Sequence, residues 1–139
     1  MDREMIVEKL ESLRRCVQRV SEKCPPDAEA LLLDFDLQDI IALNLSRAVQ
    51  LCVDIGTHFI ADLEVQPPDT MGKTFDTLSD AGVIDEVLAN QLKKAVGFRN
   101  TAVQNYEPVD WAIVHSIALN HLDDFSNFAR IVSSRLGES

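Results

Sequence analysis

One short segment, residues 99–106, combines side chains that could hold or act on a phosphate group. Arg99 and Asn100 are adjacent, Gln104 follows after three further residues, and Tyr106 lies two positions beyond it. A guanidinium beside an amide offers several N–H donors to phosphate oxygens. The same side chains could instead cap neighbouring helix ends, with Tyr106 closing a loop. The segment alone is compatible with both interpretations.

The histidines and carboxylates give weaker indications of chemistry. Asp54 and His58 are four positions apart and would share one face of a helix, as a ligand pair, a hydrogen-bonded acid–imidazole pair or polar surface. His115 and His121 are six positions apart and would face different directions. Because no third ligand stands at a convincing spacing, we expect no metal site and no other cofactor.

Familiar enzyme motifs do not account for the chain. It contains no GxGxxG, Walker or GxSxG sequence, so a nucleotide cradle or a hydrolase elbow is not supported. The paired carboxylates, Asp123 with Asp124 and Asp34 with Asp36, suit solvent-facing charge or helix caps. Nucleotidyl transfer by this chain would need aspartates on strands, and no segment has the alternating pattern of a half-buried strand.

Apolar periodicity instead predicts helices along the whole chain. An amphipathic helix over 3–23 ends at Pro25-Pro26, and a short helix follows over 28–34. Asp36 is the expected N-cap of a long, very apolar helix over 37–64, which would be central in a bundle or buried in a dimer. A loop over 65–73, a helix over 74–81 stopped at Gly82, a helix capped by Asp85 and a last helix over 109–136 complete the prediction. We expect an all-α antiparallel bundle of about five helices, three of them long, as one domain over 1–139.

Composition limits the class of protein. The chain has 139 residues, 46% of them apolar, and a formal net charge of −10 from 23 acidic and 13 basic side chains. Such a balance argues against RNA or DNA binding over the whole surface, although it leaves room for a local basic site and for a basic partner. We expect a cytoplasmic protein that does not cross a membrane, with reduced cysteines, of which Cys16 and Cys52 suit the core.

Basic side chains gather in two places. Arg15, Arg19 and Lys23 follow one another at four-residue steps along the first helix, as a solvated face or as a track for phosphates. Lys93 and Lys94 precede the 99–106 segment by one to two helical turns, which makes this the most basic stretch of the second half.

The 99–106 segment resembles the signature of the HEPN superfamily, and in particular of its HepT branch. That signature is an arginine followed, after a short spacer whose first residue is usually polar, by a histidine, one further residue and a tyrosine. Arg99, Asn100 and Tyr106 match its two ends. The length, the helical layout and runs of the long second helix agree over nearly the whole chain; the matching residues include Arg47, Asp54 and His58, which become candidate supporting residues.

The resemblance implies the toxin of a type VII-like toxin–antitoxin module. It implies a homodimer in which two Arg99 segments line a shared cleft and cleave RNA, either tRNA or mRNA, without a metal. In that chemistry a histidine would move the proton of the ribose 2′-hydroxyl or of the leaving oxygen, and the arginine would stabilise the phosphate. An MntA-like nucleotidyltransferase antitoxin would silence the toxin by attaching adenylyl groups to Tyr106, which adds bulk and negative charge.

The chain departs from this signature at the position of the catalytic histidine, where it has Gln104. Glutamine has no titratable proton near neutral pH, so it can position a substrate but cannot shuttle a proton. We therefore expect an intact fold with impaired cleavage, either in a natural non-cleaving member or through replacement of the histidine. The alternative is a helical binding partner, or substrate-binding subunit, of a nucleotidyltransferase with no chemistry of its own.

Overall fold

The computed structural model describes residues 2–104 and 109–137. Over those residues the chain forms seven α-helices and no strand, which confirms the all-α prediction. The helices are α1 (Arg3–Lys23), α2 (Ala28–Leu33), α3 (Phe35–Ala61), α4 (Met71–Asp80), α5 (Glu86–Gln104), α6 (Trp111–Asn120) and α7 (Leu122–Gly137).

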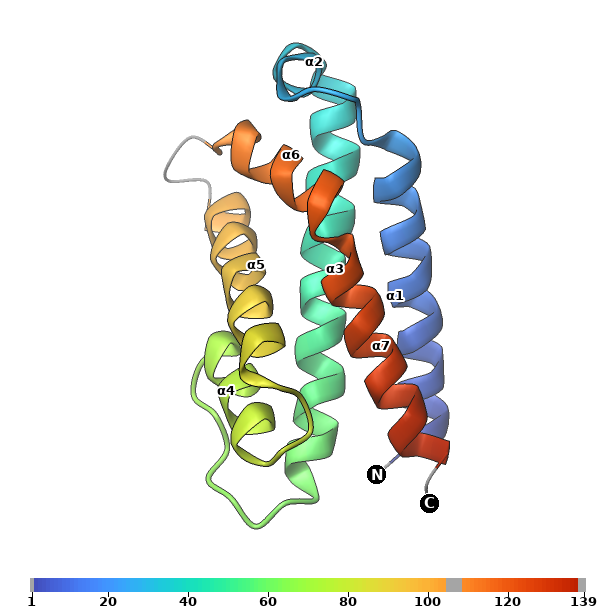
Figure 1. Cartoon of the computed structure of the whole chain (residues 1–139), viewed down its shortest axis with the longest axis vertical. Helices are drawn as coiled ribbons and strands as arrows, with labels where there is room; N and C mark the ends of the chain where they lie inside the picture. Colours follow the sequence, from blue (N-terminus) through green and yellow to red (C-terminus); the bar gives the residue numbers. More distant parts are fainter. Residues whose placement is uncertain (1, 105–108, 138–139) are drawn as a thin grey trace.

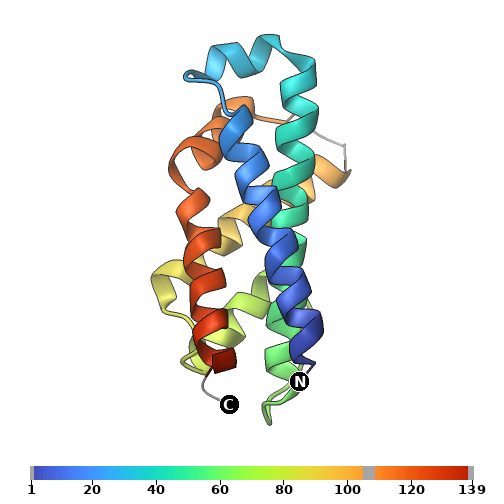
Figure 2. The same ribbon diagram turned by 90° about the vertical axis from the view of Figure 1, so that its right-hand side faces the viewer.

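The long helices form an antiparallel bundle in which α3 is central (Figure 1). Helix α1 packs along α3 in the opposite direction, and α7 descends beside α1, so that both ends of the chain lie at one end of the bundle (Figures 1 and 2). Helix α5 runs along the other side of α3, with α4 packed against both. The short helix α2 and helix α6 meet at the opposite end of the bundle.

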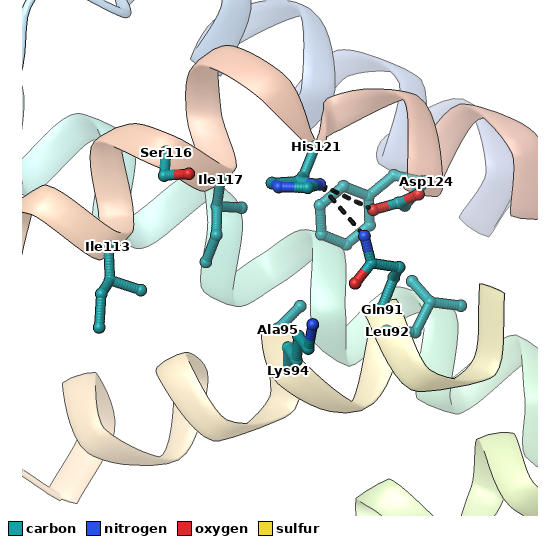
Figure 3. Close-up of a pocket in the computed structure, with 10 residues that line it drawn as sticks. Gln91, Leu92, Lys94, Ala95, Ile113, Ser116, Ile117, His121 and Asp124 are labelled. Atoms are coloured by element: carbon teal, nitrogen blue, oxygen red, sulfur yellow. Dashed lines mark hydrogen bonds and ion pairs between the residues drawn. The ribbon is translucent and has the colours of Figure 1, made fainter. Parts of the chain in front are cut away.

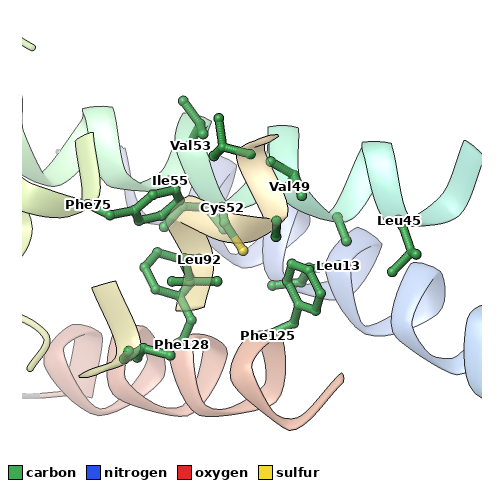
Figure 4. Close-up of a cluster of buried hydrophobic side chains, with 14 of the residues drawn as sticks. Leu13, Leu45, Val49, Cys52, Val53, Ile55, Phe75, Leu92, Phe125 and Phe128 are labelled. Atoms are coloured by element: carbon green, nitrogen blue, oxygen red, sulfur yellow. The ribbon is translucent and has the colours of Figure 1, made fainter. Parts of the chain in front are cut away.

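The core lies where α3 faces its neighbours. Leu13 of α1, Val49 and Ile55 of α3, and Leu92 of α5 are almost fully buried in one apolar cluster (Figure 4). Phe75 of α4 and Phe128 of α7 meet edge to face, with ring centroids 6.2 Å apart. Aromatic pairs prefer this arrangement because the positive ring edge meets the negative ring face.

The central position of α3 explains its composition. By length and composition alone α3 could cross a membrane, but ten of its residues are buried inside the bundle, as a core helix of a globular protein requires. Cys16 and Cys52 are buried, as predicted, and the three cysteines are free thiols.

Helix starts follow local capping chemistry, with one correction to the prediction. The side chains of Asp2, Asp27, Thr70 and Asp110 accept backbone N–H groups at the starts of α1, α2, α4 and α6. Asp85 Oδ1 accepts the Leu88 N–H at 2.7 Å, as predicted for α5. The cap of α3 is Asp34, not Asp36: Asp34 Oδ1 accepts the Leu37 N–H at 3.0 Å, and Asp36 lies in the first turn of the helix. Asp34 and Asp36 lie two positions apart at the start of this helix, and the sequence alone does not show which of them is the N-cap.

The other helix boundaries differ more in position than in kind. Helix α4 begins at Met71, because Thr70 caps it, and ends at Asp80 with Ala81 as its C-cap. Gly82 follows directly, and its φ of 77° suits a residue without a side chain. Helix α3 ends at Ala61, short of the predicted residue 64.

The predicted last helix is in fact two helices, broken at His121. Helix α6 packs against α2 and α3, whereas α7 packs chiefly against α1 and α5, so the chain must change direction between them (Figure 1). An unbroken helix over 109–136 was therefore wrong.

Candidate functional site

Helix α5 brings Arg99 against the middle of α3. Its buried face consists of Leu88, Ala89, Leu92, Ala95, Val96 and Phe98, which join the apolar core. Arg99 comes one turn after Ala95 and is half-buried. Since residues four positions apart share a helix face, the Arg99 side chain is directed toward α3 rather than into solvent.

The Arg99 guanidinium is held by neutral acceptors from three helices. Its Nη2 donates to Gln50 Oε1 of α3 at 3.2 Å. Its Nη1 donates to Asn100 Oδ1 at 3.3 Å and contacts Met71 Sδ, at the start of α4, at 3.6 Å. Arg99 therefore does not cap a helix end; it is fixed against the middle of α3.

Gln50 connects Arg99 to a second set of polar side chains. Its Nε2 donates to Asp54 Oδ1 at 2.8 Å, one turn further along α3. Asp54 Oδ2 in turn accepts Lys9 Nζ of α1 at 3.4 Å. Because the Gln50 amide is held from both ends, its oxygen is oriented toward Arg99.

This arrangement leaves the positive charge of Arg99 available. Among the residues that the structure describes, Arg99 has no ion pair: the nearest carboxylate in the network, that of Asp54, is reached only through Gln50 and is already paired with Lys9. A half-buried guanidinium held by neutral acceptors can still bind an anion through its remaining N–H groups. The geometry suits a phosphate oxygen.

A comparison of the sequence with family models matches residues 8–132 to the family described as "Ribonuclease HepT-like". The chain belongs to this HepT-like family. The resemblance drawn from residues 99–106 and the helical layout is thereby confirmed.

Individual relatives agree with the family assignment. An mRNA nuclease HepT of Shewanella oneidensis is 31% identical over 131 residues, which cover 94% of this chain and 98% of the relative. The solved structure of a tri-AMPylated HEPN toxin of Shewanella oneidensis in complex with MNT antitoxin is 31% identical and superposes with a TM-score of 0.88, covering 96% of this chain and 99% of that one. A toxin–antitoxin structure with AMP-PNP is 30% identical, with a TM-score of 0.87 and coverage of 94% and 98%.

The structure brings some positions of the HepT-like signature together and leaves others undescribed. Arg99 and Asn100 are in direct contact. Position 104 ends α5 one turn after Asn100, but the side chain of Gln104 lies outside the described part of the chain, as does all of Tyr106.

Of the candidate supporting residues, Asp54 belongs to the Arg99 network and the other two do not contact Arg99. His58 is half-buried, and Asp54 is bonded to Lys9 and Gln50 rather than to His58. Arg47 is exposed on α3, one turn before Gln50. Within the described residues, no group of three or more histidine, cysteine and acidic side chains is placed to hold a metal ion.

The remaining histidines lie elsewhere. His115 is buried, and its Nε2 donates to the Pro25 carbonyl at 2.8 Å. His121 Nδ1 lies 3.4 Å from Gln91 Nε2 and 3.6 Å from Asp124 Oδ2, at the edge of a cavity of about 240 Å³ between α5, α6 and α7 (Figure 3). Since Gln91 precedes Arg99 by eight positions, or about 12 Å along the helix axis, His121 is poorly placed to replace the family histidine.

The two lysines before Arg99 are also separated from it. Lys93 Nζ pairs with Asp76 Oδ1 of α4 at 3.1 Å, and Lys94 lines the cavity beside His121. The basic stretch predicted around residues 93–99 therefore does not form one surface. Sequence spacing also did not identify Gln50, Lys9 or Met71, which reach the site from distant parts of the chain.

Proposed function

We propose that this chain is the toxin of a type VII-like toxin–antitoxin module, a metal-independent endoribonuclease built around Arg99 and Asn100. The observation that carries the proposal is the Arg99 guanidinium, half-buried, without an ion pair among the described residues and fixed by Gln50 and Asn100. Membership of the HepT-like family and the names of the relatives, a nuclease and toxins with antitoxins, support it.

The chemistry assigned to Arg99 is stabilisation of the phosphate. In RNA cleavage the 2′-hydroxyl attacks the adjacent phosphorus while the leaving oxygen takes a proton, and negative charge grows on the phosphate oxygens. A pre-positioned guanidinium lowers that barrier, because its donors need no reorganisation at the moment of reaction. Asn100, bonded to Arg99, helps to fix its orientation.

Gln104 determines whether this chain can cleave RNA as the family signature implies. Proton transfer by a positioned side chain is typically worth about 10²–10⁴-fold in rate, and glutamine does not supply it. We propose that the chain binds RNA at Arg99 and cleaves it weakly or not at all, and that position 104 is where the missing proton-transfer group belongs.

Tyr106 is the proposed target of the antitoxin. An MntA-like nucleotidyltransferase would join the tyrosine oxygen to the α-phosphorus of ATP and release pyrophosphate. Adenylyl groups beside Arg99 would occupy its donors and repel RNA. The tri-AMPylated state of the Shewanella oneidensis toxin, which is that protein's own property, supports this proposal.

Two experiments test the module. The form with Gln104→His should stop bacterial growth when produced alone and should permit growth when an MntA-like nucleotidyltransferase is produced with it. Incubation of the present chain with that enzyme and ATP should raise its mass in adenylyl steps, and Tyr106→Phe should abolish the increase. If the histidine form neither slows growth nor cleaves RNA, the nuclease assignment is wrong.

The second candidate function is a helical binding partner of a nucleotidyltransferase with no chemistry of its own. Gln104 and the net charge of −10 favour it. Stable association with the nucleotidyltransferase, without a mass increase and without activity in the histidine form, supports this function instead.

We further propose that the protein acts as a cytoplasmic homodimer, with the Arg99 segments of two subunits facing a shared cleft. Sedimentation velocity should give a species of twice the mass of one chain. A species with the mass of a single chain at micromolar concentration contradicts this assembly.

A further inference from the structure

A groove runs between α1 and α3 on the surface next to Arg99. Its volume is about 760 Å³. Its polar lining consists of Ser12, Arg15 and Arg19 from α1 and Asn44, Arg47 and Gln50 from α3. Helices α1 and α3 lie side by side (Figure 2). They pack through their buried faces, which leaves these side chains along the outer seam.

The charge of this groove is opposite to that of the molecule. Three arginines line it and no acidic residue does, although the whole chain carries a net charge of −10. Neither Arg19 nor Arg47 makes a hydrogen bond or an ion pair with another described residue. Arg15 lies 3.6 Å from the Glu11 carboxylate, with 71% of its side chain exposed. The groove is therefore a local basic site on an acidic protein.

The charge of Arg47 also acts on Cys16, which lines the groove. Burial raises the pKa of the Cys16 thiol, and the positive charge of Arg47 opposes that rise. Cys16 belongs to α1 and Arg47 to α3, so the guanidinium acts across the seam between the two helices.

The groove is continuous with the Arg99 site through one residue. Gln50 lines the groove, and its Oε1 accepts Arg99 Nη2 at 3.2 Å. Arg47 precedes Gln50 by three positions, so it lies about one turn closer to the start of α3. A chain of phosphates that starts at Arg99 would meet Gln50 and then Arg47.

We propose that this groove, lined by Arg15, Arg19 and Arg47, is the track that holds single-stranded RNA on its way to Arg99. Arg15 and Arg19 are one turn apart, about 6 Å along the axis of α1, so they can bind phosphates in succession. Apolar side chains of Ile40, Leu43 and Leu51 complete the lining, and Leu43 is 50% exposed. Apolar contact with base faces and arginine contact with phosphates are the usual means of binding a single strand without sequence preference.

The choice of RNA as the ligand of this groove rests on the proposed function. The binding experiment below does not depend on cleavage, so its result can be distinguished from a test of the nuclease assignment. The present chain, with Gln104, permits RNA binding to be measured with little or no cleavage. The probe is a fluorescent single-stranded RNA oligonucleotide, titrated at several salt concentrations. The variant is Arg19→Gln with Arg47→Gln, compared with the parent chain. Removal of two arginine–phosphate contacts should weaken binding and reduce the slope of log affinity against log salt by about 1.4, since each contact on a single strand contributes about 0.7.

A matched control separates this effect from a change in overall charge. Arg130 and Arg135 are exposed on α7, where Arg130 is bonded to Asn127 and Arg135 donates to the Gly82 carbonyl. Arg130→Gln with Arg135→Gln also removes two charges and should leave both affinity and slope nearly unchanged. Circular dichroism should show that all forms are equally helical. If the groove variant behaves like this control, the track is wrong. If it changes the sedimentation of the protein and leaves RNA binding intact, the groove holds a second copy of the chain and the track is also wrong.

Failure of the track and failure of the nuclease assignment give different results. If Gln104→His cleaves RNA while the groove variant keeps its affinity and salt slope, only the track is overturned. If the histidine form is inactive but the groove variant loses salt-dependent RNA binding, the track stands and the nuclease assignment is overturned.

Discussion

At the scale of single residues, Gln50 decides how Arg99 is presented. Its amide receives a hydrogen bond from Arg99 and donates one to Asp54, so it holds the guanidinium without neutralising it. A carboxylate in the same position would form an ion pair with Arg99 and compete with a phosphate. A neutral amide avoids that competition.

Replacement of Gln50 by leucine should therefore weaken catalysis without unfolding the protein. In the Gln104→His background, Gln50→Leu removes one acceptor from a charged group, worth roughly 1.5–3 kcal/mol, and should slow RNA cleavage by about tenfold or more. The matched control is Gln91→Leu, since Gln91 is also half-buried but contacts His121 in the other cavity. Equal cleavage rates for the two variants would contradict the role of Gln50.

Asp124 makes stability depend on pH. Burial raises the pKa of its carboxyl, and His121, 3.6 Å away, partly offsets the rise. The folded protein therefore holds the Asp124 proton more tightly than the unfolded chain. The resulting stabilisation is present below the unfolded pKa, about 3.9, and is lost as pH rises through the folded pKa.

Asp124→Asn should remove this loss. The thermal midpoint of the variant minus that of the parent should increase between about pH 3.5 and pH 6. This interval begins near the unperturbed pKa of an aspartate and extends above it. A relative midpoint that falls over the same interval would show that the His121 contact outweighs burial.

Residue spacing predicted part of this site and could not predict the rest. The pairing of Arg99 with Asn100 was visible because the two are adjacent. The contacts of Arg99 with Gln50 and Met71 span 49 and 28 positions. Periodicity shows which face of a helix is buried, but it does not show which residue of another helix meets that face.

At the scale of helices, the α3–α4 contact depends on a residue without a side chain. A Cβ atom on Gly56 of α3 would lie 2.8 Å from Thr74 Cγ2 and 3.0 Å from Leu78 Cδ1, both in α4. Thr74 and Leu78 are buried, so they have little room to move away. The glycine is needed for close approach of the two helices.

Gly56→Ala and Gly97→Ala should have opposite effects on stability. The clash at Gly56 should cost about 1–3 kcal/mol, offset by up to about 1 kcal/mol from the better helix propensity of alanine, so that the net change destabilises the protein. Gly97 is exposed in α5 with open space around a Cβ, and its replacement should stabilise by roughly 0.5–1 kcal/mol. Urea unfolding measures both values, and stabilisation by Gly56→Ala would contradict the packing described.

Helix existence was easier to predict than helix ends. The long apolar stripe of α3 and the Asp85 cap of α5 are local signals, and both were correct. The break at His121 was missed because the apolar pattern continues through it. That break follows from α6 and α7 packing against different helices, which is tertiary information.

At the scale of the whole molecule, the single apolar cluster links helices from both ends of the sequence. Helices α1 and α7 pack against each other and against α3. We therefore propose that residues 1–139 form one domain, and thermal unfolding should show one transition whose calorimetric and van't Hoff enthalpies agree. Two separate transitions for the chain alone would contradict a single domain.

The charge of the molecule and the charge of its site differ in sign. A net charge of −10 disfavours RNA over most of the surface, whereas no acidic residue lines the groove and Arg99 has no ion pair among the described residues. RNA should thus reach the protein by one face only. Composition predicted that most of the surface disfavours RNA. It left a local basic site only as a possibility, because the groove arginines come together only when α1 and α3 pack side by side.

We propose above that residues 99–106 form a ribonuclease site that lacks only its proton-transfer group. The most direct measurement is the rate of RNA cleavage by the present chain and by Gln104→His, with Gln104→His combined with Arg99→Gln as control. We expect the histidine form to cleave at least about 10²-fold faster than the present chain, and Arg99→Gln to remove the gain. A folded histidine form that cleaves RNA no faster than the present chain would contradict the assignment of this site.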